Sequence, residues 1–463
     1  MKTYRLILAA AALAAMAACS KTEVQKDNSK VFSFQATMEE TPAPGSKATI
    51  GTNTNGKPQT YWEDRDQITV YTSADKADGV LKTAGYTFST ALSDNSLSAT
   101  FSYSGSDFTE GNCMAIYPAS SAVRDVNFTG DGNTYRMAQV TVPASQTLVA
   151  GSFDRSAAIA SAFAAEGSTA LEFKNNVALL KFRVSNNDNH VGRIESGYGD
   201  LIAGVCRVDI DQSTLEPTLT ARTCVTHVDF STGDTTPLSV GTDYYVAVRP
   251  AALTDDLKIY FDGHLVKTVS KASVPESTLK RNTVYNLGTL AKDGDSPLEL
   301  VFDFTETTLD GWPTAATAET MTGLECSYPL YGNNYSFILQ DVGGASTGAI
   351  RWVGDNRLIL NAKRYLGLPA IEGYKLTKVS AYSYTSANMV NIVKSVRTTS
   401  ADDYTDLESE IVAGGKTGVA MVKDAYNDFD LTETASNTRY YIHMVKSNGA
   451  FHRIILTYTK ATE

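Results

Sequence analysis

The sequence lacks the residue clusters from which metal sites are built. Only five cysteines and five histidines occur in 463 residues, and no two cysteines form a C-x-x-C pair. Structural zinc sites collect Cys and His ligands at short, regular spacings. We therefore expect neither a metal nor a cofactor.

Basic charge is also in short supply. Lys and Arg number 40 against 51 Asp and Glu, which gives a formal net charge of −11. A nucleic-acid-binding protein needs a basic stripe that displaces counterions from phosphates. The sequence therefore predicts no nucleic-acid partner.

No catalytic set of titratable residues can be assembled from the sequence. The adjacent carboxylates Asp402 and Asp403 are interpreted as solvated turn residues. Residues 186–190 supply oxygen atoms but lack the D-x-D-x-D-G spacing of a calcium loop. Because catalysis requires convergent groups, we expect the protein not to be an enzyme.

The only long apolar run lies at the N-terminus. Leu6–Met16 is an uninterrupted stretch of eleven residues, preceded by Lys2 and Arg5 and followed by two alanines and Cys19. A membrane-spanning helix needs about 20 residues, so residues 1–18 are predicted to be a cleaved signal peptide. The rest of the chain is expected to be soluble.

The residues that end this leader resemble a bacterial lipobox, although Met16 stands where that motif usually carries Leu. The resemblance implies that Cys19 is acylated, that residues 19–30 are a polar tether, and that the protein is anchored by lipid in the cell outer membrane, at the cell surface or in fimbriae. An ordinary secretory signal that contains a cysteine is the alternative.

The composition after the leader predicts an all-β protein of about three domains. Tyr and Phe number 24 and 17, helical periodicity is scarce, and Thr, Val, Ser and Gly dominate the segments between turn signals. The length suits three domains of roughly 150 residues each.

The first predicted strand is followed by an exposed segment. Apolar and polar residues alternate from Phe32 to Met38, which is typical of a half-buried strand. The Pro/Gly-rich segment 41–46 then leads to Lys47 and Ala48. Such segments are favoured sites of proteolysis.

Several short motifs occur in a characteristic order between residues 62 and 146. They comprise Trp62, Asp66, Ile68, Val70, Tyr71, Ala115, Tyr117, Pro118, Pro143 and Gln146. This pattern resembles the fimbrillin family, the major and minor fimbrial subunit lipoproteins of Bacteroidetes. The resemblance covers residues 31–291 and implies two tandem fimbrillin-like β-sandwich domains, 31–168 and 169–291, with a terminal strand at 281–290.

The same resemblance implies assembly by strand exchange. Members of the family lose their N-terminal strand by cleavage after a basic residue, usually Arg. Here Lys47, followed by Ala48, is the equivalent position, and Phe32–Met38 is the strand to be removed. An uncleaved strand in a monomeric lipoprotein remains the alternative.

Two cysteines flank a predicted hairpin in the second domain. Cys206 and Cys224 are close enough in sequence to pair in an oxidising compartment. Two interpretations stay open, a disulfide or two separately buried thiols.

The segment 297–463 predicts a third domain. It begins with a strand at 298–304 and closes with a hairpin about Ser447–Gly449, and its pattern resembles the jelly-roll β-sandwich modules that bind carbohydrates. Exposed aromatic rings beside planar amides form sugar platforms, and Trp312, in a turn, is expected to be exposed. The candidate glycan-binding residues are Trp312, Trp352, Tyr328, Tyr331, Tyr335 and Asn333.

Together these features predict a cell-surface lipoprotein of the fimbrillin type that acts in adhesion as a minor, tip or accessory fimbrial subunit. Its partners would be the membrane, other fimbrial subunits, and a glycan or host surface ligand. The alternative is a glycan-binding surface lipoprotein that does not polymerise.

Overall fold

The structure is a computed structural model that describes part of the 463-residue chain. The described residues are 30–39, 50–52, 58–77, 80–81, 85–94, 96–123, 134–186, 191–234, 236–305, 309–314, 322–340, 350–353, 357–386, 389–396, 408–432 and 434–461. The predicted signal peptide, the predicted lipidation site Cys19, and the predicted processing site at Lys47 and Ala48 lie outside them.

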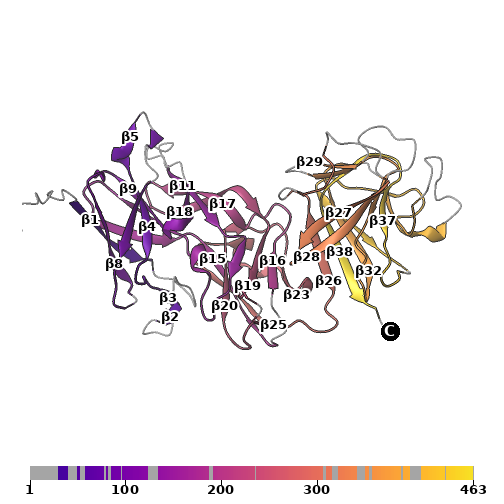
Figure 1. Ribbon diagram of the computed structural model, residues 1–463, viewed down its shortest axis with the longest axis horizontal. Coiled ribbons are helices and arrows are strands. Elements are labelled where there is room, and N and C mark those ends of the chain that lie inside the picture. The colour runs from indigo at the N-terminus through magenta and orange to yellow at the C-terminus, as the bar shows by residue number, and fades with distance from the viewer. Residues whose placement is uncertain are drawn as a thin grey trace, which may run out of the picture.

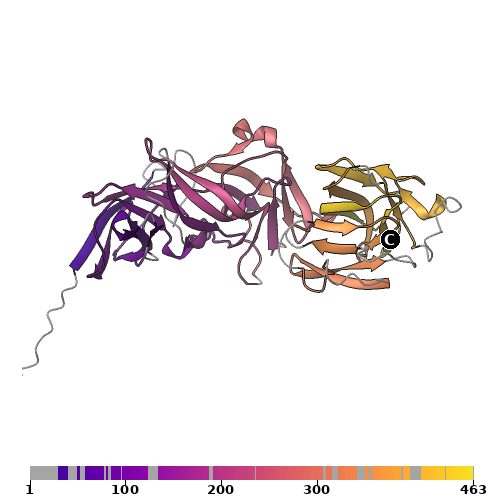
Figure 2. The same ribbon diagram turned by 90° about the horizontal axis from the view of Figure 1, so that it is seen from above.

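The described residues confirm the predicted all-β class. They form 38 strands and short 3-10 turns, and they contain no α-helix. The 3-10 turns are η1 (Ser73–Asp75), η2 (Ala119–Ser121), η3 (Arg155–Ala157), η4 (Lys271–Ser273), η5 (Pro275–Ser277) and η6 (Glu408–Glu410). Within the described part of the chain, no helix has the length and apolarity needed to cross a membrane. The strands are arranged in three units along one long axis (Figure 1 and Figure 2).

The first unit is a closed barrel rather than the predicted β-sandwich. Its strands are β1 (Lys30–Met38), β4 (Gln67–Thr72), β7 (Tyr86–Thr90), β8 (Ser98–Gly105), β9 (Cys113–Tyr117), β13 (Ala160–Ala164) and β14 (Ala170–Asn175). They close in the order β1-β14-β13-β9-β4-β7-β8. Two small hairpins accompany them, β2 (Ile50–Thr52) with β3 (Pro58–Thr60) and β5 (Lys76–Ala77) with β6 (Val80–Leu81). Alternate residues of β1 and β7 are buried, so these two strands turn one face toward the interior of the barrel.

The middle unit contains β10 (Ala122–Val123), β11 (Thr134–Val142), β12 (Ser145–Thr147), β15 (Ala178–Val184), β16 (Val191–Glu195), β17 (Ala203–Asp211), β18 (Pro217–Val225), β19 (His227–Ser231), β20 (Tyr244–Val248), β21 (Ala251–Ala252), β22 (Leu257–Phe261), β23 (His264–Val269), β24 (Thr278–Leu279) and β25 (Val284–Leu290). Its sheets include the orders β10-β11-β17-β18 and β20-β15-β25.

The sheets of the first two units do not divide the chain at residues 168 and 169. Strands β11 and β12 precede that boundary, yet they pair with β17 and β19 of the middle unit. Strand β14 follows it but closes the barrel beside β1. One hydrophobic core runs through both units, and the chain crosses between them more than once.

The third unit is a sandwich of two sheets. Its strands are β26 (Leu298–Asp303), β27 (Thr322–Leu330), β28 (Asn333–Gln340), β29 (Ile350–Val353), β30 (Arg357–Leu360), β31 (Tyr365–Gly367), β32 (Tyr374–Ser383), β33 (Met389–Val393), β34 (Ile411–Ala413), β35 (Val419–Ala420), β36 (Ala425–Asp430), β37 (Tyr441–Met444) and β38 (Gly449–Lys460). Its separate core lies between the sheet of β26, β30, β32 and β38 and the sheet of β27, β28, β31, β33 and β37.

The last two strands do not form the predicted hairpin. Strand β37 pairs with β31 and β33, whereas β38 pairs with β26, β30 and β32. The connection at residues 445–448 therefore crosses from one sheet of the sandwich to the other.

Candidate functional site

The first strand of the barrel has a partner on each side. Strand β1 runs antiparallel to β8, from Lys30 opposite Gly105 to Thr37 opposite Ser98. It runs parallel to β14, from Gln35 opposite Ala170 to Met38 opposite Phe173. The second half of β1 is therefore hydrogen-bonded along both edges, and it occupies a slot between two other strands.

The inward side chains of β1 form part of the barrel core, as the alternation of the sequence predicts. Phe34, Ala36 and Met38 are buried. The ring of Phe32 lies 4.9 Å from that of Phe108, and the ring of Phe34 lies 5.3 Å from that of Phe88. Each buried Phe or Met side chain contributes roughly 1.5–3 kcal/mol to folding, so the strand fits its slot mainly by apolar contact.

The first half of β1 borders a cavity. Residues Lys30–Phe34 have no partner on the β14 side among the described strand pairs. A cavity of about 170 Å³ lies there, lined by Phe32, Phe34, Phe108 and Cys113. The slot is thus tightly filled at one end of the strand and loosely filled at the other.

The end of β1 is fastened to the middle unit by an ion pair. Glu39 accepts two hydrogen bonds from Arg281, Nη1 to Oε2 at 2.7 Å and Nη2 to Oε1 at 3.1 Å. Arg281 also pairs with Glu216, and Glu216 Oε1 accepts a hydrogen bond from Lys174 Nζ at 2.5 Å. Burial opposes ionisation of Glu216, but the hydrogen bonds from Lys174 and Arg281 prevail and lower its pKa. No local pattern in the sequence signals this network, because its members are separated by up to 242 residues.

The motif residues that resemble the fimbrillin pattern have structural roles. Trp62 is fully buried, with its ring 4.8 Å from Phe101 and 5.1 Å from Tyr117. The Tyr117 hydroxyl donates to Asp66 Oδ1 at 2.9 Å, and Arg155 pairs with the same carboxylate. Burial raises the pKa of Tyr117. The cluster links Trp62, Asp66 and Arg155 to strands β8 and β9 of the barrel.

Gln146, another motif residue, joins two strands of the middle unit. Its Nε2 donates to the carbonyl of Ala247 at 2.6 Å, and the backbone nitrogen of Ala247 donates back to Oε1 at 2.9 Å. The side chain is buried, so a planar amide is required to satisfy both backbone groups of β20 at once.

The largest rings proposed to bind a glycan lie in the core of the third unit. Trp312 is 4 % exposed, and its Nε1 donates to the carbonyl of Ser327 at 2.8 Å. Trp352 is 6 % exposed, and its Nε1 donates to the carbonyl of Phe304 at 3.0 Å. The expectation that the turn exposes Trp312 is wrong, because the indole nitrogen donates a hydrogen bond to a backbone carbonyl and the ring packs into the core.

The other proposed glycan residues do not share one surface. Tyr328 is buried and its hydroxyl donates to the carbonyl of Asp303 at 2.8 Å. Tyr331 and Tyr335 are half-buried, and Asn333 is exposed. The Tyr331 ring faces the guanidinium of Arg193 at 5.0 Å, at the junction with the middle unit. These positions supply no common stacking platform.

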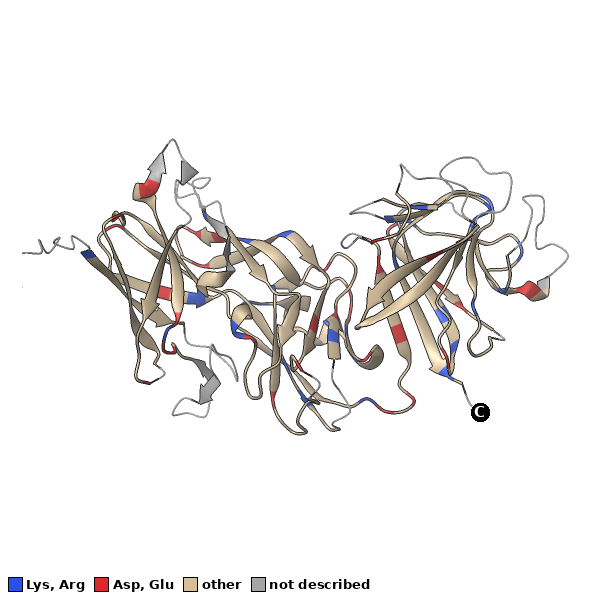
Figure 3. Cartoon of the chain, in the orientation of Figure 1, with Lys and Arg blue, Asp and Glu red and all other residues tan. Residues whose placement is uncertain are grey.

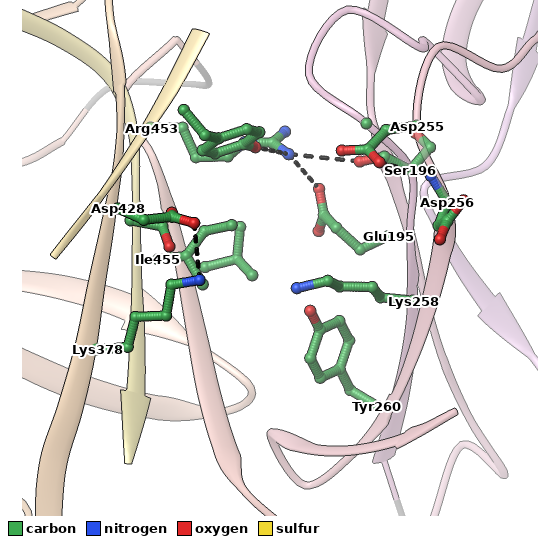
Figure 4. Close-up of a pocket in the computed structure, with 14 residues that line it drawn as sticks. Glu195, Ser196, Asp255, Asp256, Lys258, Tyr260, Lys378, Asp428, Arg453 and Ile455 are labelled. Carbon is green, nitrogen blue, oxygen red and sulfur yellow. Dashed lines mark hydrogen bonds and ion pairs between the residues drawn. The ribbon is translucent and has the colours of Figure 1, made fainter. Parts of the chain in front are cut away.

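The junction between the middle unit and the third unit is polar and charged. A cavity of about 190 Å³ lies there, with Glu195, Lys258, Lys378 and Arg453 among its lining residues (Figure 4). Arg453 lies 3.1 Å from Glu195 across the junction, and Lys378 lies 2.8 Å from Asp428 within the third unit. Charges of both signs are interspersed along all three units (Figure 3). The described residues contain no group of three or more His, Cys, Asp or Glu that could hold a metal.

The two cysteines of the predicted hairpin are free but adjacent. Cys206 Sγ on β17 and Cys224 Sγ on β18 lie 3.6 Å apart, and neither forms a disulfide. Cys224 Sγ also donates to the carbonyl of Val205 at 3.1 Å. The hydrogen bond from Cys206 is the main influence that lowers the pKa of Cys224, to about 7.

No protein-family model matches the chain, and no curated protein matches it. Among solved structures it is similar to a candidate cell adhesion protein from Bacteroides uniformis, with 16 % identity, a TM-score of 0.32, and coverage of 58 % of this chain and 94 % of that one. It is also similar to a fimbrial protein from Bacteroides ovatus, with 10 % identity, a TM-score of 0.22, and coverage of 77 % and 67 %. A fimbrial assembly protein from Parabacteroides distasonis shows 7 % identity, a TM-score of 0.23, and coverage of 56 % and 91 %.

Proposed function

We propose that the protein is a minor, tip or accessory subunit of a surface fimbria and that it acts in cell adhesion. It reaches the outer membrane as a lipoprotein anchored at Cys19, and it joins other subunits by strand exchange. The resemblance of its sequence motifs to the fimbrillin family supports this role, and the setting of β1 gives the role a physical basis.

The single observation that carries the proposal is that β1 fills a slot between β8 and β14. Removing β1 would leave two strands with unpaired backbone groups along their edges. It would also open the apolar sites now occupied by Phe34, Ala36 and Met38. An extended segment of another subunit can satisfy both the backbone groups and the apolar sites by strand addition.

Cleavage between Lys47 and Ala48 would separate the body of the protein from its lipid anchor and allow β1 to leave its slot in one step. The lipidated Cys19 and strand β1 lie on the same side of that bond. A cut there separates the body of the protein from its lipid, and it permits β1 to leave.

The third unit favours a tip or accessory position over a repeating shaft position. Strand β25, which resembles the terminal strand of fimbrillins, pairs with β15 along its length. The chain then continues into β26, which pairs with β23 and with β38. Strand β25 is therefore held at both ends and is poorly placed to leave this subunit and enter another.

The proposal is tested by cutting the full chain after Lys47 and following its assembly. We expect protein from native cells to begin at Ala48, and we expect the cut protein to form SDS-resistant or filamentous multimers. The variant Lys47→Ala is the matched control and stays uncut and monomeric. If the cut protein remains monomeric at high concentration, assembly by strand exchange is wrong.

A further inference from the structure

The residue that follows β1 is held more specifically than the strand itself. Glu39 comes directly after Met38, the last inward-facing residue of β1. Its carboxylate receives both arms of the Arg281 guanidinium and the backbone nitrogen of Asn175 at 3.1 Å. Bidentate pairing of Arg with a carboxylate is strong and depends on geometry. The strand thus ends at a binding site for a carboxylate, formed by Arg281 and the backbone nitrogen of Asn175 and called the receptor below.

This receptor stays behind when β1 leaves, because Arg281 belongs to the middle unit. Around it stand Glu39, Glu216 and Lys174. With Glu39 gone, two cations would face one carboxylate, Glu216, at a site where the Arg281 side chain is only 21 % exposed. Removing one of the two carboxylates that pair with a partly buried cation is costly, so the open slot favours an acidic residue and disfavours a basic one.

A cavity continues from the receptor. It has a volume of about 510 Å³ and is lined by Arg281, Leu219 and Leu279, among others. Asn176 also lines it; this side chain is 2 % exposed, and its Nδ2 has no hydrogen-bond partner within the described part of the chain. A backbone carbonyl of a chain that passes beyond the acidic residue would satisfy this buried donor.

The slot before the receptor restricts the size of the inward side chains. Ala36 is fully buried and lies opposite Ala99 on β8 and Leu171 on β14. Phe34 and Met38 occupy larger sites on either side of it. A strand that fits must therefore be small at the middle inward position and large at its neighbours.

We propose that Arg281 selects the incoming strand. The partner is an extended segment with the pattern large apolar, x, small, x, large apolar, acidic, and its acidic residue takes the place of Glu39 on Arg281. This inference rests on the proposed strand exchange and names the partner that the slot accepts.

The test uses the full chain cut after Lys47 and a labelled synthetic peptide of residues 30–39, KVFSFQATME. Exchange of the peptide into the slot is followed by fluorescence anisotropy. We expect a Glu39→Gln peptide to bind about tenfold more weakly, since it loses the bidentate ion pair with Arg281. We expect a Glu39→Lys peptide to bind about a hundredfold more weakly, since its positive charge is also repelled by Arg281.

Variants of the protein assign the effect to Arg281. With Arg281→Gln, the difference in affinity between the unaltered peptide and the Glu39→Gln peptide should fall below about threefold. Lys280→Gln is the matched control, because Lys280 is next in the chain but pairs with Glu276 instead, and it should leave the difference intact. Should Arg281→Gln fail to fold, the three peptides on the unaltered protein still decide the matter.

The outcomes separate the two proposals. If the unaltered peptide does not enter the slot, strand exchange itself is wrong and the inference falls with it. If all three peptides bind equally, strand exchange stands and selection by Arg281 is overturned.

Discussion

The guanidinium of Arg453 on β38 lies 3.1 Å from the carboxylate of Glu195 on β16, and these side chains are 1 % and 5 % exposed. The same guanidinium lies 2.7 Å from Asp303 on β26. One cation of the third unit is therefore shared by a carboxylate of its own unit and one of the middle unit. This arrangement fixes the third unit against the middle unit.

We expect Arg453→Met to destabilise the protein by about 3–5 kcal/mol, because it leaves Asp303 as a buried carboxylate without its cation and leaves Glu195 with its longer ion pair to Arg193, at 3.6 Å. Chemical unfolding followed by circular dichroism measures the loss. Lys378→Met is the matched control, since Lys378 and Asp428 form a half-exposed pair on the same face, and its cost should be below about 1 kcal/mol. Equal effects of the two variants would contradict a special role for the buried cation.

Trp312 provides a second prediction. Its ring packs against Phe304 and Phe337 in the core, with centroids 5.6 and 5.5 Å away. Trp312→Ala should therefore cost about 3–5 kcal/mol, whereas Trp312→Phe should cost less and leave the unit folded. Thermal unfolding checks both.

The same pair of variants tests the glycan-binding role. Any glycan bound by the protein should still be bound by the folded Trp312→Phe variant, because the indole is not exposed. If the unaltered protein binds a glycan on an array and the folded Trp312→Phe variant does not, the burial of the ring is contradicted.

Local patterns in the sequence were sufficient to predict individual strands. The alternation from Phe32 to Met38 predicts β1, and the strand predicted at 298–304 is β26. The turn at Ser447–Gly449 led to the wrong prediction of a hairpin, because turn residues show that a chain bends but do not show which sheet it enters next. There Asn448 Oδ1 accepts a hydrogen bond from the backbone nitrogen of Ala362 at 2.8 Å, which holds the crossing in place.

The polar contacts that organise the site could not be predicted from the sequence. Glu39 and Arg281 are 242 residues apart, and each is an ordinary charged residue in its own segment. Their pairing depends on how the barrel sits on the middle unit. The burial of Trp312 also depends on a contact that is distant in sequence. A turn favours exposure of a side chain, but here the indole nitrogen donates a hydrogen bond to the carbonyl of Ser327 on β27 and the ring is buried.

Cys206 and Cys224 provide a third prediction. Their sulfur atoms lie 3.6 Å apart on neighbouring strands, and with the pKa of Cys224 lowered to about 7 a thiolate is available near neutral pH. With oxidised glutathione we expect one intramolecular disulfide between them, formed more slowly below pH 7. Mass spectrometry should show the loss of two hydrogens, and unfolding should show a gain of about 3 kcal/mol.

The other buried cysteines are the internal controls for this reaction. Cys113 and Cys326 should stay reduced, because burial raises the pKa of each thiol to about 11. Cys206→Ser should abolish the disulfide. Mixed disulfides with glutathione at Cys224, with no internal bond, would show that the strands hold the two sulfur atoms apart.

His443 on β37 makes the stability of the third unit depend on pH. The side chain is 6 % exposed, its Nδ1 lies 3.0 Å from Asn391 Oδ1, and its ring stacks on Tyr365 at 4.4 Å. Burial, assisted by the positive charge of Lys363, lowers the pKa of His443 to about 4. In the unfolded chain the pKa is about 6.5.

Between these two values the unfolded chain binds a proton at His443 that the folded protein does not. Stability is therefore fully present above about pH 6.5 and falls as the pH drops toward 4, by about 3 kcal/mol in total. His443→Gln should make this part of the profile shallower, with the remaining slope coming partly from His452, whose pKa burial also lowers. Unfolding by urea at several pH values measures the profile, and His264→Gln is the matched control. A profile for His443→Gln as steep as that of the unaltered protein would mean that His443 is protonated within the fold.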